Sequence, residues 1–318
     1  MNILNNFEKQ LKLVSKFNGV CLNIEEKTKL DFGLKELMLK TKNEALYFWG
    51  KITGEDSDYY IAMGVNYKGH YEFPEKIFYY ATPNFEFDVL PETFPYHDKD
   101  VNDSYYKPLK GNPNLVLKKY KEDIPEGENP DGGEPKKEEE NKEGEEGADP
   151  NKPANIQDPD ASVDDNAPKK EEPKENFTEK LKLSYLVRKI DYDTNIVPEG
   201  ALKLVSEHEI RVNKSFKGLN KEEISDMSKW MHFRPVSESK KKMLEEEDAV
   251  FRKDIFDPIT EDELKGSWSL QLDTTKTSCN LRSLLWPGYY ACHQGNTNLY
   301  CGVYFGNGMK SLELPFMI

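Results

Sequence analysis

The C-terminal stretch, residues 266–318, alternates short apolar runs with turn residues, and it constrains the fold more strongly than any other part of the chain. Trp268, Leu270 and Leu272 alternate with polar residues, which is the period of two expected of a strand with one buried face. Pro287 and Gly288 mark a turn, because Pro fixes φ and Gly accepts a positive φ. We therefore predict a meander of strands over residues 268–272, 279–283, 289–293 and 300–305, and a last core strand carrying Leu312, Leu314 and Phe316.

The N-terminal part predicts two helices. Apolar residues at helical spacing indicate a first helix that ends at Asn18 and Gly19 and carries Ile3, Leu4, Phe7, Leu11 and Val14. Asn23 is the expected N-cap of a second helix, with Leu30, Leu34, Leu37 and Met38 on one face. We expect both helices to cover a sheet, because most apolar stripes face their own core. The alternative is that the first helix docks on another subunit.

Aromatic-rich strands are predicted over residues 45–53 and 58–64, joined by a hairpin turn at 54–57. Simple alternation places Phe48, Gly50 and Ile52 on one face of the first strand, and Tyr47 and Trp49 on the other. Both faces are apolar, so we expect this strand to be covered on both sides. A further strand pair is predicted at 77–81 and 85–89.

Residues 122–175 are expected to form a long disordered acidic insert. They hold 20 Asp or Glu, 7 Lys, eight prolines and no aromatic residue, a net charge of −13 out of −14 for the chain. Such a segment cannot bury enough apolar surface to offset the entropy of ordering it. We expect a solvated spacer; the alternative is an acidic arm that keeps the protein off an acidic surface or engages a basic partner. The rest of the chain is near neutrality and lacks the basic excess of a nucleic-acid-binding protein.

The fold is expected to resume after the insert. Apolar residues alternating with polar ones predict a half-buried strand over 181–187, with Leu181, Leu183, Tyr185 and Val187 inward. Residues 192–198 and 201–205 are candidates for pairing near it around Gly200. Asn220 and Glu223 form a variant capping box that predicts a helix bearing Ile224, Met227 and Trp230, and another helix is predicted at 237–253. The chain thus divides into an N-terminal part of the folded domain (1–121), the insert (122–175) and a C-terminal part (176–318), and we expect the two folded parts to share a core.

No catalytic or metal-binding motif stands out. Cys292 and His293 are adjacent, but neighbours on a strand point to opposite faces and cannot form a nucleophile and base pair. A zinc site from Cys279, Cys292, His293 and Cys301 lacks the paired ligand spacing of zinc proteins, so buried strand cysteines are the favoured interpretation. The phosphate-binding, dinucleotide-binding and zinc-protease motifs are also absent from the sequence. We expect no enzymatic activity, no cofactor and no metal.

The sequence also indicates a compartment. Residues 1–19 contain Glu8, Lys9, Lys12 and Lys16 and no uninterrupted apolar run of a signal peptide. No run approaches the ~18 apolar residues that a membrane span needs. Four cysteines in a chain of this length fit a reducing compartment. We expect an intracellular protein, soluble or held in a soluble assembly, without nucleic-acid or membrane partners.

Four strings carry a resemblance to a known family. They are YFWGKITGEDSDYYIAMG (47–64), KGSWSLQL (265–272), LRSLLWPG (281–288) and YCGVYFGNGMKSLELPFMI (300–318), and HFRPV (232–236) adds a fifth. In this order they resemble the radial spoke head family, which comprises head proteins 4, 6 and 9 of the ciliary radial spoke.

The resemblance implies a non-catalytic structural subunit of the radial spoke head in the ciliary axoneme. Its implied partners are radial spoke head proteins 4 and 6, other head and stalk subunits, and projections of the central pair. Through these contacts it would relay mechanical signals to dynein arms. Trp49 and Trp286 are the interface candidates, because each lies in a matching string; the alternative is that both are core. The other class of function left open is an undetected hydrolase or a small-molecule or metal-binding module, which predicts a pocket with convergent polar groups and perturbed carboxylates.

Overall fold

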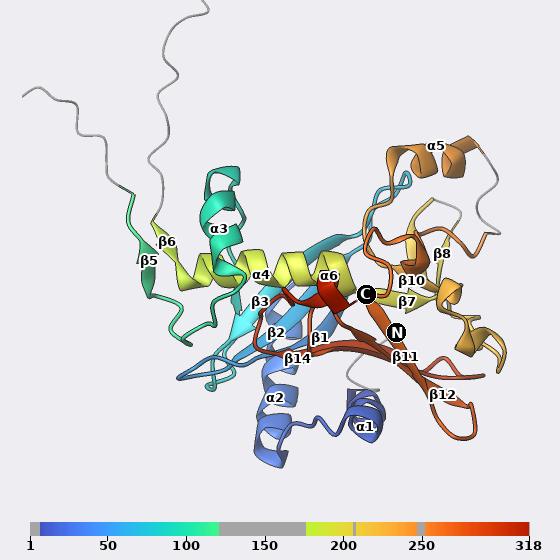
Figure 1. The fold of residues 1–318 in the computed structure, drawn as a ribbon, viewed down its shortest axis with the longest axis horizontal. Coiled ribbons are helices and arrows are strands. Elements are labelled where there is room, and N and C mark those ends of the chain that lie inside the picture. Colours follow the sequence, from blue (N-terminus) through green and yellow to red (C-terminus); the bar gives the residue numbers. More distant parts are fainter. Residues whose placement is uncertain (1–6, 121–175, 206–207, 247–251, 318) are drawn as a thin grey trace, which may run out of the picture. The chain divides into compact units, whose positions relative to one another are not determined.

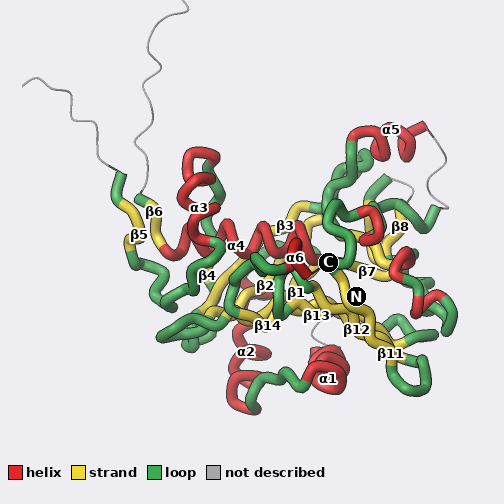
Figure 2. The backbone as a smooth tube through the Cα atoms, viewed as in Figure 1, coloured by secondary structure: helices red, strands yellow, loops and turns green. Residues whose placement is uncertain are grey.

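The computed structural model describes residues 7–120, 176–205, 208–246 and 252–317. The described residues up to Lys118 and from Phe177 onward form one compact unit. The acidic insert predicted at 122–175 lies outside the described residues. Figure 2 shows strands running through the middle of the unit, with helices on both sides.

An eight-stranded sheet in the order β11-β12-β13-β14-β1-β2-β3-β4 forms the centre. All neighbours in it are antiparallel except β1 and β14, which are parallel. The two meanders, one from each end of the chain, therefore join through β1 and β14 (Figure 1). The predicted α+β class, with a mainly antiparallel sheet and a C-terminal meander, is confirmed. The strands are β1 (Ala45–Ile52), β2 (Tyr59–Asn66), β3 (Glu75–Ala81), β4 (Asp88–Val89), β11 (Trp268–Leu272), β12 (Ser278–Ser283), β13 (Tyr289–Gln294) and β14 (Tyr300–Gly306).

The junction between β1 and β14 needs a glycine. Gly50 lies opposite Tyr304, and a Cβ at Gly50 would come 2.2 Å from the Tyr304 carbonyl oxygen. Since real Cβ atoms do not approach a backbone oxygen so closely, a side chain here would push the two strands apart. The two meanders can pair only because this position is glycine.

Strand β1 also contains a β-bulge at Trp49. The register with β2 passes from Phe48 opposite Ala62 directly to Gly50 opposite Ile61, so Trp49 is an extra residue. The bulge reverses the alternation. The prediction that Phe48, Gly50 and Ile52 share a face is therefore wrong: Phe48 packs with the N-terminal helices, whereas Ile52 packs in the same cluster as Trp49. The prediction that β1 is covered on both sides is confirmed.

Helices α1 (Phe7–Asn18) and α2 (Ile24–Lys40) cover one face of the sheet. They bury apolar residues against Phe48 and Tyr60, among them Phe7, Leu11, Val14, Leu30, Leu34 and Leu37. The Asn23 side chain and the Glu26 side chain exchange the hydrogen bonds of a capping box at the start of α2. The prediction that both helices cover a sheet is confirmed, although Met38 is 41% exposed; Ile3 and Leu4 of the first predicted helix lie outside the described residues.

Helix α4 (Glu179–Thr194) covers the opposite face, packing Leu183, Leu186, Val187 and Ile190 into the cluster that holds Trp49 and Trp286. The predicted strand at 181–187 is therefore wrong. The alternating pattern predicted a strand with one solvent-exposed face. In the structure the polar residues Lys182 and Ser184 are buried as well, so the pattern does not mark an exposed face. Lys182 donates to the carbonyl oxygens of Lys107 (2.9 Å) and Pro108 (3.1 Å), and Ser184 donates to that of Pro91 (2.6 Å).

Short strands form three small sheets beside the large one. The segments predicted around Gly200 do not pair with each other, because each finds another partner. The pairs are β7 (Ile196–Pro198) with β10 (Trp230–His232), β8 (Leu202–Leu204) with β9 (Ile210–Val212), and β5 (Val116–Lys118) with β6 (Phe177–Thr178).

The helix predicted from Asn220 is also wrong. Both capping hydrogen bonds form: the Asn220 amide donates to the Glu223 carboxylate (2.9 Å) and the Glu223 amide to the Asn220 side chain (2.8 Å). The chain then turns extended at Asp226 (φ −100°, ψ 117°), so only 3₁₀ turns follow, before Trp230 enters β10. These turns are η3 (Glu223–Ser225) and η4 (Met227–Lys229).

The remaining elements are α3 (Asp98–Ser104), α5 (Glu238–Glu246), α6 (Leu314–Met317), η2 (Pro95–His97) and η6 (Ile259–Glu261). Helix α5 confirms the start of the helix predicted at 237–253, and residues 247–251 lie outside the described residues. The predicted last core strand is wrong: α6 takes its place, and Phe316 is 91% exposed. Within the described ranges, no helix combines the length and apolarity needed to span a membrane.

Candidate functional site

The structure places both interface candidates, Trp49 and Trp286, inside the unit. Trp49 is 5% exposed, and its indole Nε1 donates to Asp191 Oδ1 at 3.1 Å. Trp286 is fully buried, and its Nε1 donates to Asp193 Oδ2 at 2.9 Å. Both indoles thus donate to carboxylates near the C-terminal end of α4 (Glu179–Thr194), although the two tryptophans come from opposite halves of the sequence. Their predicted role at an interface with another subunit stays a prediction.

Asp191 is also the acceptor in a buried ion pair. It receives hydrogen bonds from Lys76 Nζ at 2.5 Å and Asn195 Nδ2 at 2.8 Å, in addition to Trp49. Lys76 donates further to the carbonyl oxygen of Phe233 at 2.6 Å and lies over the Phe233 ring. Burial lowers the pKa of Lys76, and the neighbouring Asp191 carboxylate opposes that shift. The pair joins β3, α4 and the segment after β10.

Glu179, in the first turn of α4, makes a second buried cluster. Its carboxylate accepts hydrogen bonds from the Tyr59 hydroxyl (2.7 Å) and from the backbone amides of Lys110 (3.0 Å), Gly111 (2.7 Å) and Asn112 (3.0 Å). Burial and the hydrogen bond to Glu179 raise the pKa of Tyr59. Glu179 therefore fastens a loop of the N-terminal half to the helix that follows the insert.

The sequence pattern did not reveal these buried acids, because it predicted a strand over 181–187 where the structure has helix α4. Had the segment been assigned as a helix, Thr178 followed by Glu179 would have indicated an N-cap and a first-turn acid. Asp191 would then have fallen four residues after Val187, on the buried face.

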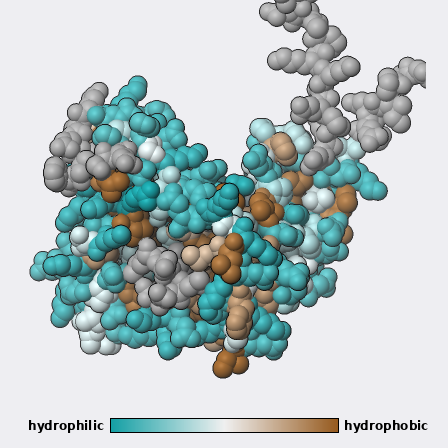
Figure 3. Space-filling view, turned by 180° about the vertical axis from the view of Figure 1, so that it is seen from behind, coloured by the Kyte–Doolittle hydropathy of each residue, from teal (hydrophilic) through white to brown (hydrophobic). Residues whose placement is uncertain are grey.

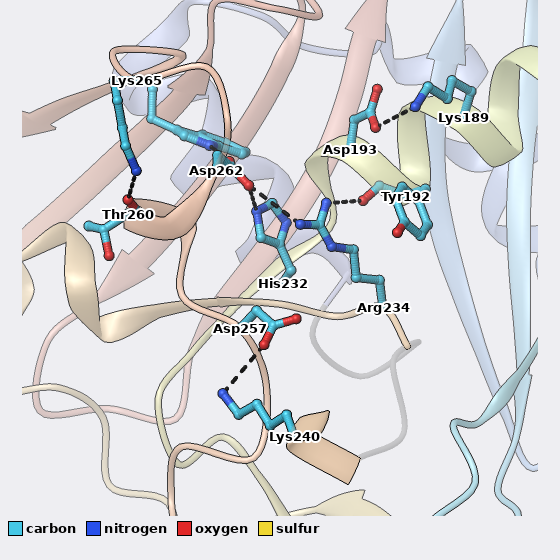
Figure 4. Close-up of polar contacts among 11 residues, drawn as sticks. Lys189, Tyr192, Asp193, His232, Arg234, Lys240, Asp257, Thr260, Asp262 and Lys265 are labelled. Atoms are coloured by element: carbon cyan, nitrogen blue, oxygen red, sulfur yellow. Dashed lines mark hydrogen bonds and ion pairs between the residues drawn. The ribbon is translucent and has the colours of Figure 1, made fainter. Parts of the chain in front are cut away.

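His232 and Asp262 form a pair that superficially resembles part of a hydrolase triad (Figure 4). The ring Nε2 lies 2.8 Å from Asp262 Oδ1, and Trp268 Nε1 donates to Asp262 Oδ2 at 2.9 Å. Burial acts to raise the pKa of Asp262, but the hydrogen bonds from His232 and Trp268 and the charge of Arg234 lower it. His232 is fully buried, and within the described ranges no hydroxyl or thiol bonds its Nδ1. Asp262 therefore links His232 of β10 to Trp268 of β11, and the His232–Asp262 pair has no nucleophile beside it within the described ranges.

The cysteines and His293 separate onto the two faces of the sheet. Cys292 lies opposite Cys301, and Cys279 lies opposite His293. Cys292 packs in the cluster with α1 and α2, whereas His293 contacts the ring of Trp230. The geometric argument against a Cys292 and His293 pair is confirmed. In the part of the chain that the structure describes, no three His, Cys, Asp or Glu side chains are placed to hold a metal ion.

A cavity of about 100 Å³ lies where β1 and β2 meet β7, β13 and β14. Its described lining includes Tyr47, Tyr67, Asn195 and Tyr300 but no carboxylate. Small-molecule sites typically measure ~300–1,000 Å³, so this cavity is small for a ligand site. The described lining of this cavity holds no carboxylate, whereas a more open hollow of about 500 Å³ is lined by Glu55, Asp100 and Glu179 together with lysines.

The two aspartates of α4 predict a contrast in stability. Asp191→Asn leaves Lys76 buried without a counter-charge, so we expect the free energy of unfolding to fall by about 3–5 kcal/mol. Asp193→Asn is the matched control. Its charged partner Lys189 is 38% exposed, and the amide oxygen of Asn can still accept from the Trp286 indole, so the loss should be about 1 kcal/mol. Urea unfolding followed by tryptophan fluorescence measures both, and equal losses would contradict the buried ion pair.

His293 predicts a pH dependence. Its Nε2 accepts from the Leu219 amide (3.1 Å), its Nδ1 lies 3.0 Å from the Leu299 carbonyl oxygen, and burial lowers its pKa below the ordinary 6.5. The unfolded chain therefore binds a proton more readily. The contribution of neutral His293 to the free energy of unfolding should be fully present above pH 6.5. It should decline as the pH falls from 6.5 through the lowered pKa of the folded state.

Urea midpoints between pH 4.5 and 7.5 test this pH dependence. His293→Gln should flatten the slope in this range, and His70→Gln, at an exposed position, should leave it unchanged. Identical slopes for the wild type and His293→Gln would contradict the assignment.

This chain is similar to a known protein family and to several of its members. The sequence model of the radial spokehead-like protein family matches residues 3–193. The radial spoke head protein 9 homolog of Danio rerio is 31% identical over 302 residues, which cover 95% of this chain and 95% of that protein. The homologs of Bos taurus and Homo sapiens are each 38% identical over 141 residues, covering 44% of this chain and 51% of theirs. The chain belongs to the radial spokehead-like protein family.

Proposed function

We propose that this chain is a non-catalytic structural subunit of the ciliary radial spoke head. The observation that carries the proposal is the match to a radial spoke head protein across 95% of both chains. Radial spoke head proteins are components of the ciliary axoneme, so the chain acts there. Its partners in this proposal are head proteins 4 and 6 and other head and stalk subunits.

The buried chemistry supports a role through shape and rigidity. The acids described above accept hydrogen bonds from indoles, backbone amides or Lys76 inside the unit, and His232 is paired with Asp262, so these groups hold the fold. A rigid subunit of this kind transmits force from central-pair projections toward the dynein arms by contact alone. The alternative of a hydrolase or a small-molecule or metal-binding module finds no carboxylate in the described lining of the 100 Å³ cavity, and in the 500 Å³ hollow Glu179 is already bonded to Tyr59 and three backbone amides.

Trp286 supports an interface indirectly in this proposal. The loop that carries it also carries Leu284, which is 41% exposed. The Ser311 amide donates to the Leu285 carbonyl oxygen at 2.9 Å and holds the segment after β14 beside this loop. Leu312 in that segment is 57% exposed. Trp286 and, on β1, Trp49 would thus position surface segments that contact another subunit.

Affinity purification tests the assignment. The tagged full chain, purified from salt-extracted ciliary axonemes, should bring down other spoke head and stalk proteins in near-stoichiometric amounts. The reason is that a structural subunit leaves the axoneme with its neighbours. Recovery of the chain alone, from the detergent-soluble fraction, would overturn the proposal.

Substitutions in the Trp286 loop test the interface. Because Trp286 is fully buried, Trp286→Ala should cost about 3–5 kcal/mol of stability. A folded Trp286→Ala protein that fails to join the head would support the interface, and an insoluble one would refute a role beyond packing. Leu284→Gln should stay folded and reduce recovery of head subunits. Leu264→Gln, at a leucine that is 37% exposed elsewhere, is the matched control, and equal recovery with both variants would contradict the loop's role.

A further inference from the structure

Helix α2 is apolar on two opposite faces. One face carries Leu30, Leu34 and Leu37, which are buried against the sheet. At Gly33, an added Cβ would lie 2.6 Å from the carbonyl oxygen of Phe85, so the helix backbone is in close contact with the turn beneath it. This contact fixes the rotation of α2, and its other face cannot turn inward.

The outward face carries large apolar side chains that are open to solvent. Ile24 is 85% exposed, Phe32 is 66% exposed and Leu39 is 88% exposed. With Thr28 and Lys35 between them, they follow one another at intervals of three or four residues, so they form a single stripe along the helix. Figure 3 shows this surface as a column of brown side chains over α2. We call these five residues the α2 stripe.

The charges along the α2 stripe are paired within the helix. Lys29 bonds Glu25 at 2.6 Å, Lys35 bonds Asp31 at 2.5 Å and Lys40 bonds Glu36 at 2.6 Å, each four residues apart. A surface whose charges are already balanced offers little attraction to a charged partner. It favours a partner that is apolar where it touches α2.

We propose that the α2 stripe binds an amphipathic α-helix of another radial spoke head subunit. This inference rests on the proposed function. The spacing of the stripe is that of a helix–helix seam, in which side chains three and four residues apart interdigitate with those of the facing helix. A helix of 17 residues is about 25 Å long, which allows several turns of contact.

Area and charge favour a different subunit over a second copy of this chain. Stable independent interfaces bury ~1,200–2,000 Å² in total, and one stripe with three large side chains is well short of that. The contact therefore works between subunits that are also held together elsewhere. Antiparallel self-pairing of two α2 helices about Phe32 would oppose Lys29 to Lys35, so like charges would meet at a contact between two identical copies.

A triple substitution tests the surface in full-length protein. Ile24→Gln, Phe32→Gln and Leu39→Gln together should leave the melting temperature unchanged, because the positions are exposed and Gln is a good helix former. Purified from axonemes, this variant should recover at least ten-fold less of the subunit that supplies the helix. The matched control changes Glu25, Lys29 and Glu36 to Gln on the same helix and should recover the wild-type amount.

Crosslinking identifies the occupant. Photoreactive benzoylphenylalanine at position 32 should attach to a helical segment of another spoke head subunit, at residues spaced by three and four. Attachment to a second copy of this chain, to an extended segment or to no protein would overturn the inference, as would wild-type recovery with the triple variant. If the wild-type chain itself recovers no spoke proteins, the proposed function fails instead.

Discussion

The carboxylates of α4 are the interaction on which the unit depends. Glu179, Asp191 and Asp193 lie on one helix, and they receive donors from β1, β2, the 110–112 loop and the loop between β12 and β13. A buried carboxylate is costly unless several donors satisfy it, so Glu179 and Asp191, which are buried, hold their donors in one arrangement, and Asp193 adds the bond to the buried Trp286 indole. Because those donors come from both sides of the insert, the two halves of the chain cannot pack independently. The parallel pairing of β1 with β14 then closes the sheet between them.

The elements with one clear period were predictable from the sequence. The strands predicted between residues 268 and 305 and the two N-terminal helices each carry apolar residues at one clear period, and the structure confirms these elements. Helix α4 was not predictable by the same rule, because its polar residues are buried too and leave no wet face to set the period. The bulge at Trp49 is a long-range effect. One extra residue in β1 is visible only against the register of β2.

The buried site was harder to predict than the fold. The indoles of Trp49 and Trp286 attracted attention as possible surface anchors, yet each donates to a carboxylate inside the unit. Indole and acid lie 93 residues apart or more in the sequence, so no local pattern links them. The apolar face of α2 was predictable only on its inner side. That the opposite face of α2 is also apolar and open to solvent became evident only from the exposed fractions of Ile24, Phe32 and Leu39.

The position of the insert follows from the same packing. Lys118 pairs with Phe177 across β5 and β6, and the Glu179 amide donates to the Leu115 carbonyl oxygen at 2.8 Å. The two ends at which the chain leaves and re-enters the unit are therefore already adjacent. The entropic cost of closing a chain segment grows slowly with its length, by ~0.6 kcal/mol for each doubling. The length of the insert consequently has little effect on whether the strands and helices of this unit form. The requirement is that the hydrogen bonds from the 110–112 amides to Glu179 hold the two ends of the insert next to each other.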